Sequence, residues 1–271
     1  MDQFTKRRIS VYGINGCLDA LKSSLVEINQ VYLENASPAS EHKELESLYS
    51  KLPKDKVLLV DQTSFAKKID NNRAQGILIN AQVSVFQTLP LPKHKNECYV
   101  ILDQVQDPHN LGQILRICAG GNVDGVIITD RSSVSMTSAV AQVSQGGFAK
   151  IPLYEINNIN QTILHFKEHD CWITSFENNI NAQNWYSIDF QGRTVLIFGG
   201  EGSGISKQVL KMGHRSSQDS ILGVGMIFLP KRDFGAQEKC RAIVEYEIIK
   251  AGMNLFGWRQ VPVNTEIIGE K

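Results

Sequence analysis

Hydrophobic and polar positions follow two different patterns along the chain. From residue 96 onward, runs that are apolar throughout alternate with segments of helical periodicity. Strands that are apolar on both faces and separated by helices are typical of a parallel sheet covered on both sides. Ligands bind such a sheet at the carboxyl ends of its strands. The predicted strands are residues 98–105, 124–130, 151–156, 171–176 and 194–200, and the predicted helices are 110–121, 137–149, 158–169 and 205–213.

The pattern nearer the amino terminus is less regular. A helical spacing of apolar residues runs from Val11 to Leu25, and short strand and helix patterns follow it. This mixture predicts a compact α/β unit over residues 1–81. Residues 82–95 contain two prolines among polar residues, which predicts a semi-rigid linker between two domains.

Composition narrows the class of protein. With 271 residues, 42% of them hydrophobic, the chain is long enough for about two packed domains. Lys and Arg number 28 and Asp and Glu 28, and this balance excludes a protein that coats polyanions without selectivity. Residues 1–95 carry a small positive excess and residues 96–215 a small negative one, an arrangement that suits an anionic substrate held by an accessory part.

Neither a membrane segment nor a cysteine framework is predicted. No run of about 18 apolar residues occurs, so we expect a soluble, cytoplasmic protein without a membrane partner. The cysteines are odd in number and lack the C-x-x-C spacing, so neither disulfides nor a structural metal site is expected. They are Cys17, Cys98, Cys118, Cys171 and Cys240.

The first segment with candidate chemistry is LDQVQDPHNLGQILR, residues 102–116. A strand ends at Asp107-Pro108, Asn110 is positioned to cap the next helix, and Gly112 permits close backbone approach. Arg116 lies less than two helical turns after Asn110, so both side chains are able to address one space. A capped helix with a solvated arginine explains the same spacing.

The second is VLIFGGEGSGIS, residues 195–206. Four glycines after an apolar strand describe a turn whose backbone is open to a ligand. The loop lacks the lysine of a Walker A motif and the G-x-G-x-x-G spacing of dinucleotide sites. Glu201 at its centre would repel a phosphate and accept hydrogen bonds from a cationic or hydroxyl-bearing ligand.

Taken together, the two loops resemble a specific family. LDxVxDPH with NLGxxxR, followed later by FGGEGxGIS, is similar to the first two signature motifs of the SpoU/TrmH RNA ribose 2′-O-methyltransferases. VYGIN at residues 11–15 and RAQGIL at 73–78 are similar to the RNA-binding accessory domain of members that act on large-subunit ribosomal RNA. The resemblance extends from residue 8 to about residue 215.

The resemblance implies a fold, a cofactor and a set of site residues. It implies an RNA-binding domain over 1–81 and a SPOUT-type methyltransferase domain over 96–215, with a trefoil knot, which is an exception among folds. It further implies a homodimer that uses S-adenosylmethionine, needs no metal and methylates RNA, most simply ribosomal RNA. The matched catalytic residues are Asn110, Arg116 and Glu201, and the matched donor-binding residues are Gly199, Gly200, Glu201, Gly202 and Gly204.

The sequence departs from the family after residue 215. The third family motif, which contains Ser-Leu-Asn and forms the threaded segment, is missing. Residues 216–271 resemble instead a fragment of the glutaminase domain of glutamate synthase. That family uses an amino-terminal cysteine, and this sequence begins Met1-Asp2, so no glutaminase activity is expected. We expect an altered or incomplete knot and weakened donor binding and dimerisation.

Three functions stay open at this point. The first is 2′-O-methylation of RNA, with transfer RNA as an alternative substrate to ribosomal RNA. The second is a catalytically impaired remnant whose RNA affinity is indifferent to S-adenosylmethionine. The third, a glutamine amidotransferase fragment, requires an exposed amino-terminal cysteine.

Overall fold

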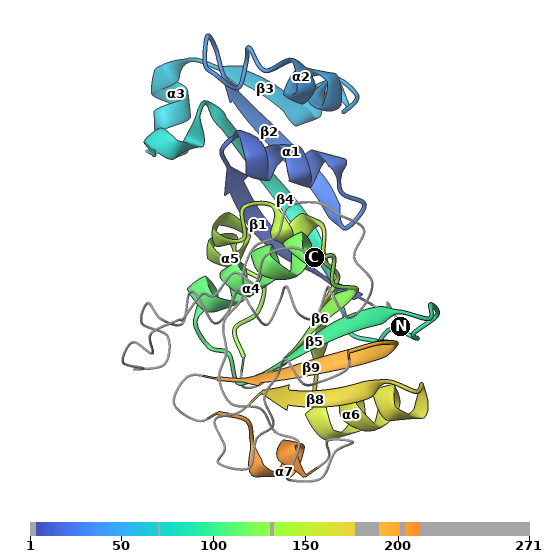
Figure 1. Cartoon of the computed structure of the whole chain (residues 1–271). Helices are drawn as coiled ribbons and strands as arrows, with labels where there is room; N and C mark the ends of the chain where they lie inside the picture. The colour runs from blue at the N-terminus through green and yellow to red at the C-terminus, as the bar shows by residue number, and fades with distance from the viewer. Residues whose placement is uncertain (1–3, 70, 131–132, 177–189, 201–203, 212–271) are drawn as a thin grey trace, which may run out of the picture.

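The computed structural model describes residues 4–69, 71–130, 133–176, 190–200 and 204–211. The tail predicted over residues 216–271 lies outside these ranges, and so does the expected change in the knot. Figure 1 shows an upper lobe, formed by the first strands and helices, above a lower lobe that contains the remaining elements. None of the helices in these ranges combines the length and apolar character needed to cross a membrane.

The described strands form one nine-stranded sheet that runs through both lobes. Its order is β3-β2-β4-β7-β6-β5-β9-β8, and β1 pairs with β4. β4 pairs antiparallel with β1 and β2, whereas all other pairs are parallel. The predicted α/β class with a mainly parallel sheet is therefore confirmed. The strands are β1 Phe4–Tyr12, β2 Val26–Glu34, β3 Val57–Val60, β4 Ile77–Phe86, β5 Glu97–Asp103, β6 Gly125–Thr129, β7 Leu153–Ile156, β8 Trp172–Phe176 and β9 Arg193–Gly199.

Helices cover both faces of the sheet. In β5, Val100 and Leu102 pack into one core, and Tyr99 and Ile101 pack into a second core on the opposite face. This two-sided burial explains why β5 is apolar at nearly every position. The α-helices are α1 Ile14–Lys22, α2 Lys43–Tyr49, α3 Gln62–Ala66, α4 Pro108–Gly120, α5 Ser138–Val143, α6 Ile159–Glu168 and α7 Lys207–Leu210, and the short 3-10 helices are η1 Lys54–Lys56, η2 Asn72–Ala74 and η3 Gly147–Ala149.

Two predictions about the first lobe were wrong. The linker does not begin at residue 82, because β4 continues through Phe86, held by β1 on one side and by β7 on the other. The helical spacing from Val11 to Leu25 overstated the helix, since Val11 belongs to β1. Gly13, with φ of 84°, separates that strand from α1.

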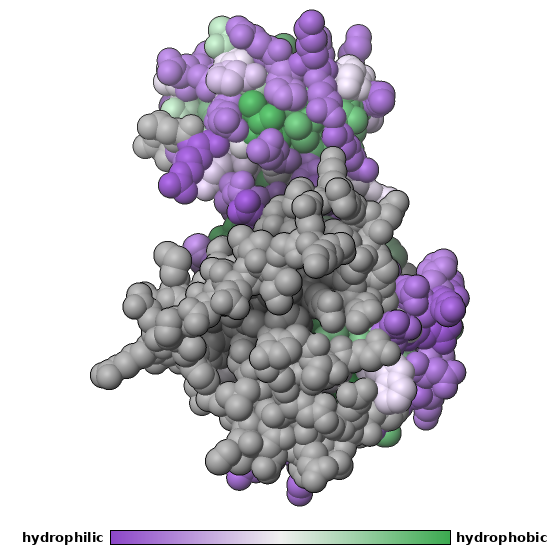
Figure 2. All heavy atoms as spheres, viewed as in Figure 1, coloured by the Kyte–Doolittle hydropathy of each residue, from purple (hydrophilic) through white to green (hydrophobic). Residues whose placement is uncertain are grey.

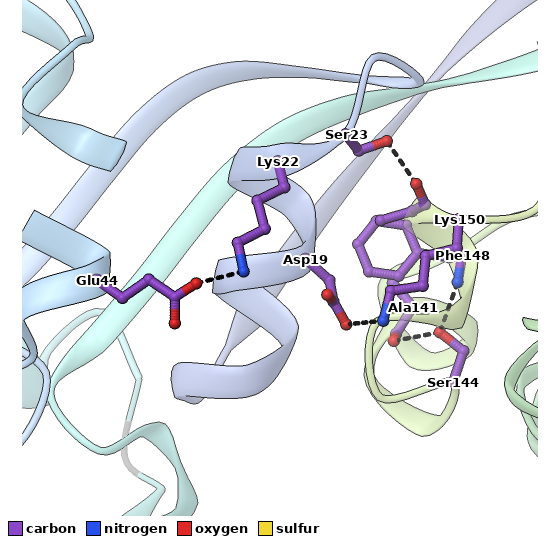
Figure 3. A network of polar contacts seen from close by, with 9 residues as sticks. Asp19, Lys22, Ser23, Glu44, Ala141, Ser144, Phe148 and Lys150 are labelled. Carbon is purple, nitrogen blue, oxygen red and sulfur yellow. Dashed lines mark hydrogen bonds and ion pairs between the residues drawn. The ribbon is translucent and has the colours of Figure 1, made fainter. Parts of the chain in front are cut away.

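Polar contacts hold the two lobes together. Ser23 donates to the carbonyl of Ala149 at 2.5 Å, and Lys150 pairs with Asp19 at 2.8 Å. Figure 3 shows Lys150 reaching toward Asp19. Both contacts join α1 of the first lobe to the η3 region of the second. They fix how the first lobe is placed over α4 and α5.

α5 also completes the free edge of β1. The backbone N–H of Ser10 donates to Ser138 Oγ at 2.8 Å, and that of Tyr12 donates to Gln142 Oε1 at 3.3 Å. An edge strand otherwise leaves such groups unpaired. The second lobe therefore supplies hydrogen-bond partners that β1 lacks within its own sheet.

In the view of Figure 2, the surface of the first lobe is mainly hydrophilic.

Candidate active site at the carboxyl ends of the central strands

The two loops identified in the sequence leave the sheet side by side. β5 and β9 are parallel neighbours, and Asp103 at the end of β5 lies opposite Gly199 at the end of β9. Because parallel strands present their carboxyl ends at one edge, the loop after β5 and the glycine turn after β9 start from the same place.

The glycine turn is built from close backbone contacts. The N–H of Gly204 donates to the carbonyl of Gly200 at 3.1 Å, and Gly204 has φ of 63°. A Cβ added at Gly199 would lie 2.2 Å from the carbonyl carbon of Gly204, and one added at Gly200 would lie 2.2 Å from the oxygen of Gln104. Larger residues would therefore displace the backbone itself. The predicted site residues Glu201 and Gly202 lie outside the described residues.

Asp103 holds this turn, and the sequence reasoning missed it. Its side chain is 3% exposed, and its Oδ2 accepts a hydrogen bond from the backbone N–H of Ser206 at 3.1 Å. Ser206 directly precedes α7, so the carboxylate ties the end of the glycine turn to the end of β5. The available signal was a carboxylate that ends an otherwise apolar strand.

The loop after β5 is also held on its other side. Gln104 has φ of 65°, a left-handed conformation that few residues other than glycine adopt. Val105, the next residue, accepts a hydrogen bond at its carbonyl from the N–H of Val134 at 2.8 Å. Val134 belongs to the segment after β6, so the loops that follow three adjacent strands are joined at one edge.

α4 starts at this edge but is not capped by Asn110 as predicted. Asp107 is the N-cap, accepting from the N–H of His109 at 2.8 Å, and Pro108 takes the first helical position, which favours helix initiation. Asn110 is half-buried in the first turn. It therefore lies close to the point where β5 ends.

Arg116 occupies a different part of α4. Six residues separate it from Asn110, which corresponds to about 9 Å along the axis and about 120° around it. Its side chain is exposed, and its backbone lies against η3, because a Cβ added at Gly147 would be 2.8 Å from the nitrogen of Arg116. The atoms nearest to Gly199 and Gly200 belong to Gly204 and Ile205 and to the end of β5.

Buried polar atoms without partners lie at the same edge. Within the described residues, the hydroxyls of Ser135 and Ser175 are buried and have no hydrogen-bond partner. Ser175 is near the carboxyl end of β8, and Ser135 follows β6. Buried hydroxyls are normally satisfied, so these two atoms fit a polar organic ligand at this edge. The stacked rings of Phe176 and Phe198, 4.7 Å apart, add an apolar wall.

Two buried thiols among the described residues, Cys171 and Cys17, are poor nucleophiles. Cys171 is 1% exposed, and burial raises its pKa to about 12. Burial also raises the pKa of the Cys17 thiol well above its ordinary value. Thiols with such pKa values remain protonated and unreactive near neutral pH. Among the described residues, no group of three or more His, Cys, Asp or Glu side chains could hold a metal ion.

Solved structures of methyltransferases share this fold. The SpoU methyltransferase AviRb of Streptomyces viridochromogenes, solved with AdoMet, aligns with a TM-score of 0.66 at 13% identity over 87% of this chain and 89% of its own. An AdoMet-bound rRNA methyltransferase of Sinorhizobium meliloti aligns at 0.63 with 17% identity, over 93% of this chain and 89% of its own. The architecture is therefore that of the SpoU-type methyltransferases.

Sequence comparison finds similarity to two families. The model of the SpoU rRNA Methylase family matches residues 97–218, and that of the class-II glutamine amidotransferases matches residues 202–271. A Staphylococcus haemolyticus protein classed in the TrmH family of tRNA/rRNA methyltransferases is 40% identical over 110 residues, 41% of this chain and 44% of its own. Residues 97–218 are thus similar to the SpoU methylase domain, and the chain spans less than half the length of the curated relatives it matches.

Both resemblances inferred from the sequence are confirmed by these matches. The amidotransferase match covers the tail that replaces the third methyltransferase motif. It also overlaps the end of the methylase match over residues 202–218. The SpoU match itself continues to residue 218, so the departure from the SpoU pattern follows the glycine turn and the start of the next helix.

Proposed function

We propose that this protein transfers a methyl group from S-adenosylmethionine to a ribose 2′-hydroxyl of RNA, with ribosomal RNA as the substrate. The observation that carries the proposal is the junction of β5 and β9, where the two signature loops meet and Asp103 holds the glycine turn. A cytoplasmic homodimer is part of the same proposal and rests on the family resemblance.

The chain's own residues would bind the donor and position the acceptor. S-adenosylmethionine supplies an electrophilic methyl group for an in-line displacement. The backbone at Gly199, Gly200 and Gly204 would hold the donor, and Asn110 would orient the ribose from the first turn of α4. Glu201 would accept a hydrogen bond from a hydroxyl group or face the positive charge of the donor.

Arg116 would act by charge and position. A guanidinium has a pKa above 12 and is a poor general base, so we assign it to stabilising the developing alkoxide. Its exposed position in α4 leaves it accessible to a large substrate such as RNA. Because this role concerns charge that develops only during transfer, loss of Arg116 should affect transfer far more than donor binding.

Calorimetric titration of S-adenosylmethionine into the full chain tests the donor site, and transfer of labelled methyl groups to ribosomal RNA tests the activity. We expect a micromolar dissociation constant for the donor. Arg116→Ala should abolish transfer and leave that constant within about twofold. Lys43→Ala, an exposed change on α2, is the matched control and should leave both unchanged. Transfer at the normal rate by Arg116→Ala would contradict its assigned role.

The second candidate is an RNA-binding remnant without catalysis. The observation that favours it is the amidotransferase match over residues 202–271, in place of the third motif. A chain that binds RNA with an affinity indifferent to S-adenosylmethionine, and that gives no heat with the donor, would support this candidate instead.

A further inference from the structure

Two consecutive glycines connect the first lobe to the helix that carries Arg116. Gly146 is the N-cap of η3 and Gly147 is its first residue, and both are buried. A Cβ added at Gly146 would lie 2.1 Å from Oδ2 of Asp19 on α1. One added at Gly147 would lie 2.8 Å from both the nitrogen and the Cα of Arg116 on α4. The side chain of Asp19 and the backbone of Arg116 therefore lie against neighbouring residues of one short turn.

Two polar contacts hold α1 against this turn. The Oδ2 atom of Asp19 pairs with Nζ of Lys150, directly after η3, and the Asp19 side chain is only 20% exposed. Ser23, the C-cap of α1, donates to the carbonyl of Ala149. The hydroxyl of Ser23 also accepts from the backbone N–H of Leu25 at 3.0 Å, which fixes its orientation. α1 is thus bonded at two points to the residues that follow Gly147.

η3 is itself firmly held in the second lobe. Ser144 Oγ accepts from the N–H of Phe148 at 3.2 Å and donates to the carbonyl of Ala141 at 2.8 Å, which ties η3 to α5. Phe148 is 2% exposed and belongs to the same core as Leu115 of α4. Close-packed interiors transmit displacements because they are hardly compressible. A shift of η3 would therefore move the backbone of α4 that lies against it.

A second line of contacts reaches α4 nearer its start. Gln142 of α5 accepts from the N–H of Tyr12 and donates to the carbonyl of Tyr12, both at 3.3 Å. α5 packs closely on α4, since a Cβ added at Gly112 would lie 2.7 Å from Cβ of Val143. Gly112 lies two residues after Asn110. The first lobe is thus connected to α4 near Asn110 through α5, and further along the helix through η3.

We infer that Asp19 of the first lobe is a positioning residue for methyl transfer, acting through η3 on Arg116. The inference rests on the proposed function, which assigns Arg116 to stabilising the developing alkoxide. Loss of Asp19 would release η3 and misplace the guanidinium, and a misplacement of about 1 Å is enough to slow a reaction by up to about 100-fold. Because a carboxylate repels phosphate, the loss of Asp19 removes no group that attracts RNA.

The kinetic test uses the full chain with labelled S-adenosylmethionine and ribosomal RNA. Asp19→Ala should lower kcat about tenfold, while KM for RNA and the dissociation constant of the donor stay within about twofold. Adding Ser23→Ala should lower kcat further, because it removes the second contact to η3. Asp19→Asn keeps the size of the side chain and an acceptor for Lys150, so it should recover part of the lost rate.

Lys22→Ala is the matched control on the same helix. Lys22 pairs with Glu44 at 2.5 Å, and both residues belong to the first lobe. Figure 3 shows Lys22 directed toward Glu44, away from Asp19 and Lys150. This variant also removes one charge of an ion pair on α1, yet it leaves the contacts with η3 in place. It should keep the original kcat.

Amide hydrogen exchange of the free protein gives a readout that does not depend on catalysis. Asp19→Ala should speed exchange several-fold in η3 and in α4 around Arg116. α6 packs into the core on the opposite face of the sheet and should exchange as before. Gly147→Ala should have a larger effect on both kcat and exchange, because its methyl group would displace the backbone of Arg116 directly. Lys22→Ala should leave all these rates unchanged.

The outcomes separate this inference from the proposed function. Unchanged kcat in Asp19→Ala, in a chain that methylates RNA, would overturn the inference and leave the function standing. A loss of kcat matched by an equal loss of RNA affinity, or shared by Lys22→Ala, would also overturn it. If the original chain methylates no RNA, faster exchange in α4 of Asp19→Ala would sustain the coupling and refute the function, whereas unchanged exchange would refute both. Circular dichroism checks that the variants remain folded.

Discussion

β4 and β5 are adjacent in the chain and belong to one sheet, yet they are buried in different ways. In β4 the second half alternates between buried and half-buried residues, whereas every residue of β5 is buried. β4 pairs with antiparallel strands whose second face is partly open, and β5 lies between parallel strands covered on both faces. Side chains along β4 are therefore free to contact a ligand, whereas the region of β5 offers a ligand mainly the ends of its strands.

The largest expected effect on this contrast comes from shortening one side chain to alanine in each strand and measuring the free energy of unfolding. Ile101 of β5 is fully buried, so Ile101→Ala should lower the free energy of unfolding by about 2–5 kcal/mol. Gln82 of β4 is half-buried on the open face, so Gln82→Ala should change it by about 0.5 kcal/mol or less. Urea denaturation of both variants measures the difference, and comparable losses would show that the face of β4 is not open.

The second effect concerns the edge where the strands end. Gly199→Ala would place a methyl group 2.2 Å from backbone atoms of Gly204, and we expect a loss of about 2–3 kcal/mol together with loss of donor binding. Gly192→Ala is a matched control, because Gly192 has φ of 85° and no neighbouring atom within 4 Å. It should cost about 1 kcal/mol and leave donor binding intact. Equal losses of stability and of donor binding in the two variants would show that close packing at Gly199 does not set the requirement for glycine there.

The same contrast explains what could be predicted from the sequence. The strands of the second lobe were predicted because two-sided burial makes them apolar runs, as in Val126–Ile128 of β6. β1 was missed because its open face carries Lys6 and Arg8, which made the segment resemble a solvated terminus. The end of β4 was assigned to a linker because its half-buried residues Gln82 and Ser84 are polar, and pairing with β7 involves residues about 70 positions away.

In the candidate site too, features that depend on local sequence were predicted, and features that depend on contacts between distant residues were not. Its two loops and their glycines were identified from motifs and local turn chemistry. The role of Asp103 was not, because its partner Ser206 is distant in sequence and the hydrogen bond depends on β5 lying beside β9. Asn110 was assigned as a cap, although Asp107-Pro108 is the stronger start signal. Glu201 and Gly202 stay predictions, since they lie outside the described residues.

A third effect tests the contact between the antiparallel and the parallel part of the sheet. Arg7 of β1 pairs with Glu155 of β7 at 2.5 Å, and their side chains are 39% and 3% exposed. Arg7→Ala would leave a buried carboxylate without its cation, and we expect a loss of about 2 kcal/mol, moderated by the partial exposure of Arg7. Removing both charges with Arg7→Met and Glu155→Gln should recover at least half of that loss. A double variant as unstable as Arg7→Ala would show that lost packing, and not the unpaired charge, causes the loss of stability.

The smallest expected effect tests whether the cores of the two lobes exclude water to the same extent. Cys17 is a buried residue of α1 in the first lobe, and Cys171 precedes β8 in the second. Burial raises the pKa of both thiols, that of Cys171 to about 12. An unfolded thiol ionises near pH 8.5, so the folded state binds more protons above that pH, and its stability falls as pH rises toward the folded pKa. Each thiol should remove about 1 kcal/mol of stability between pH 8.5 and 9.5, and Cys17→Ala and Cys171→Ala should each flatten the decline equally. If only Cys171→Ala flattens it, Cys17 ionises in the folded protein, and the first lobe admits water to its core as well as to its open face.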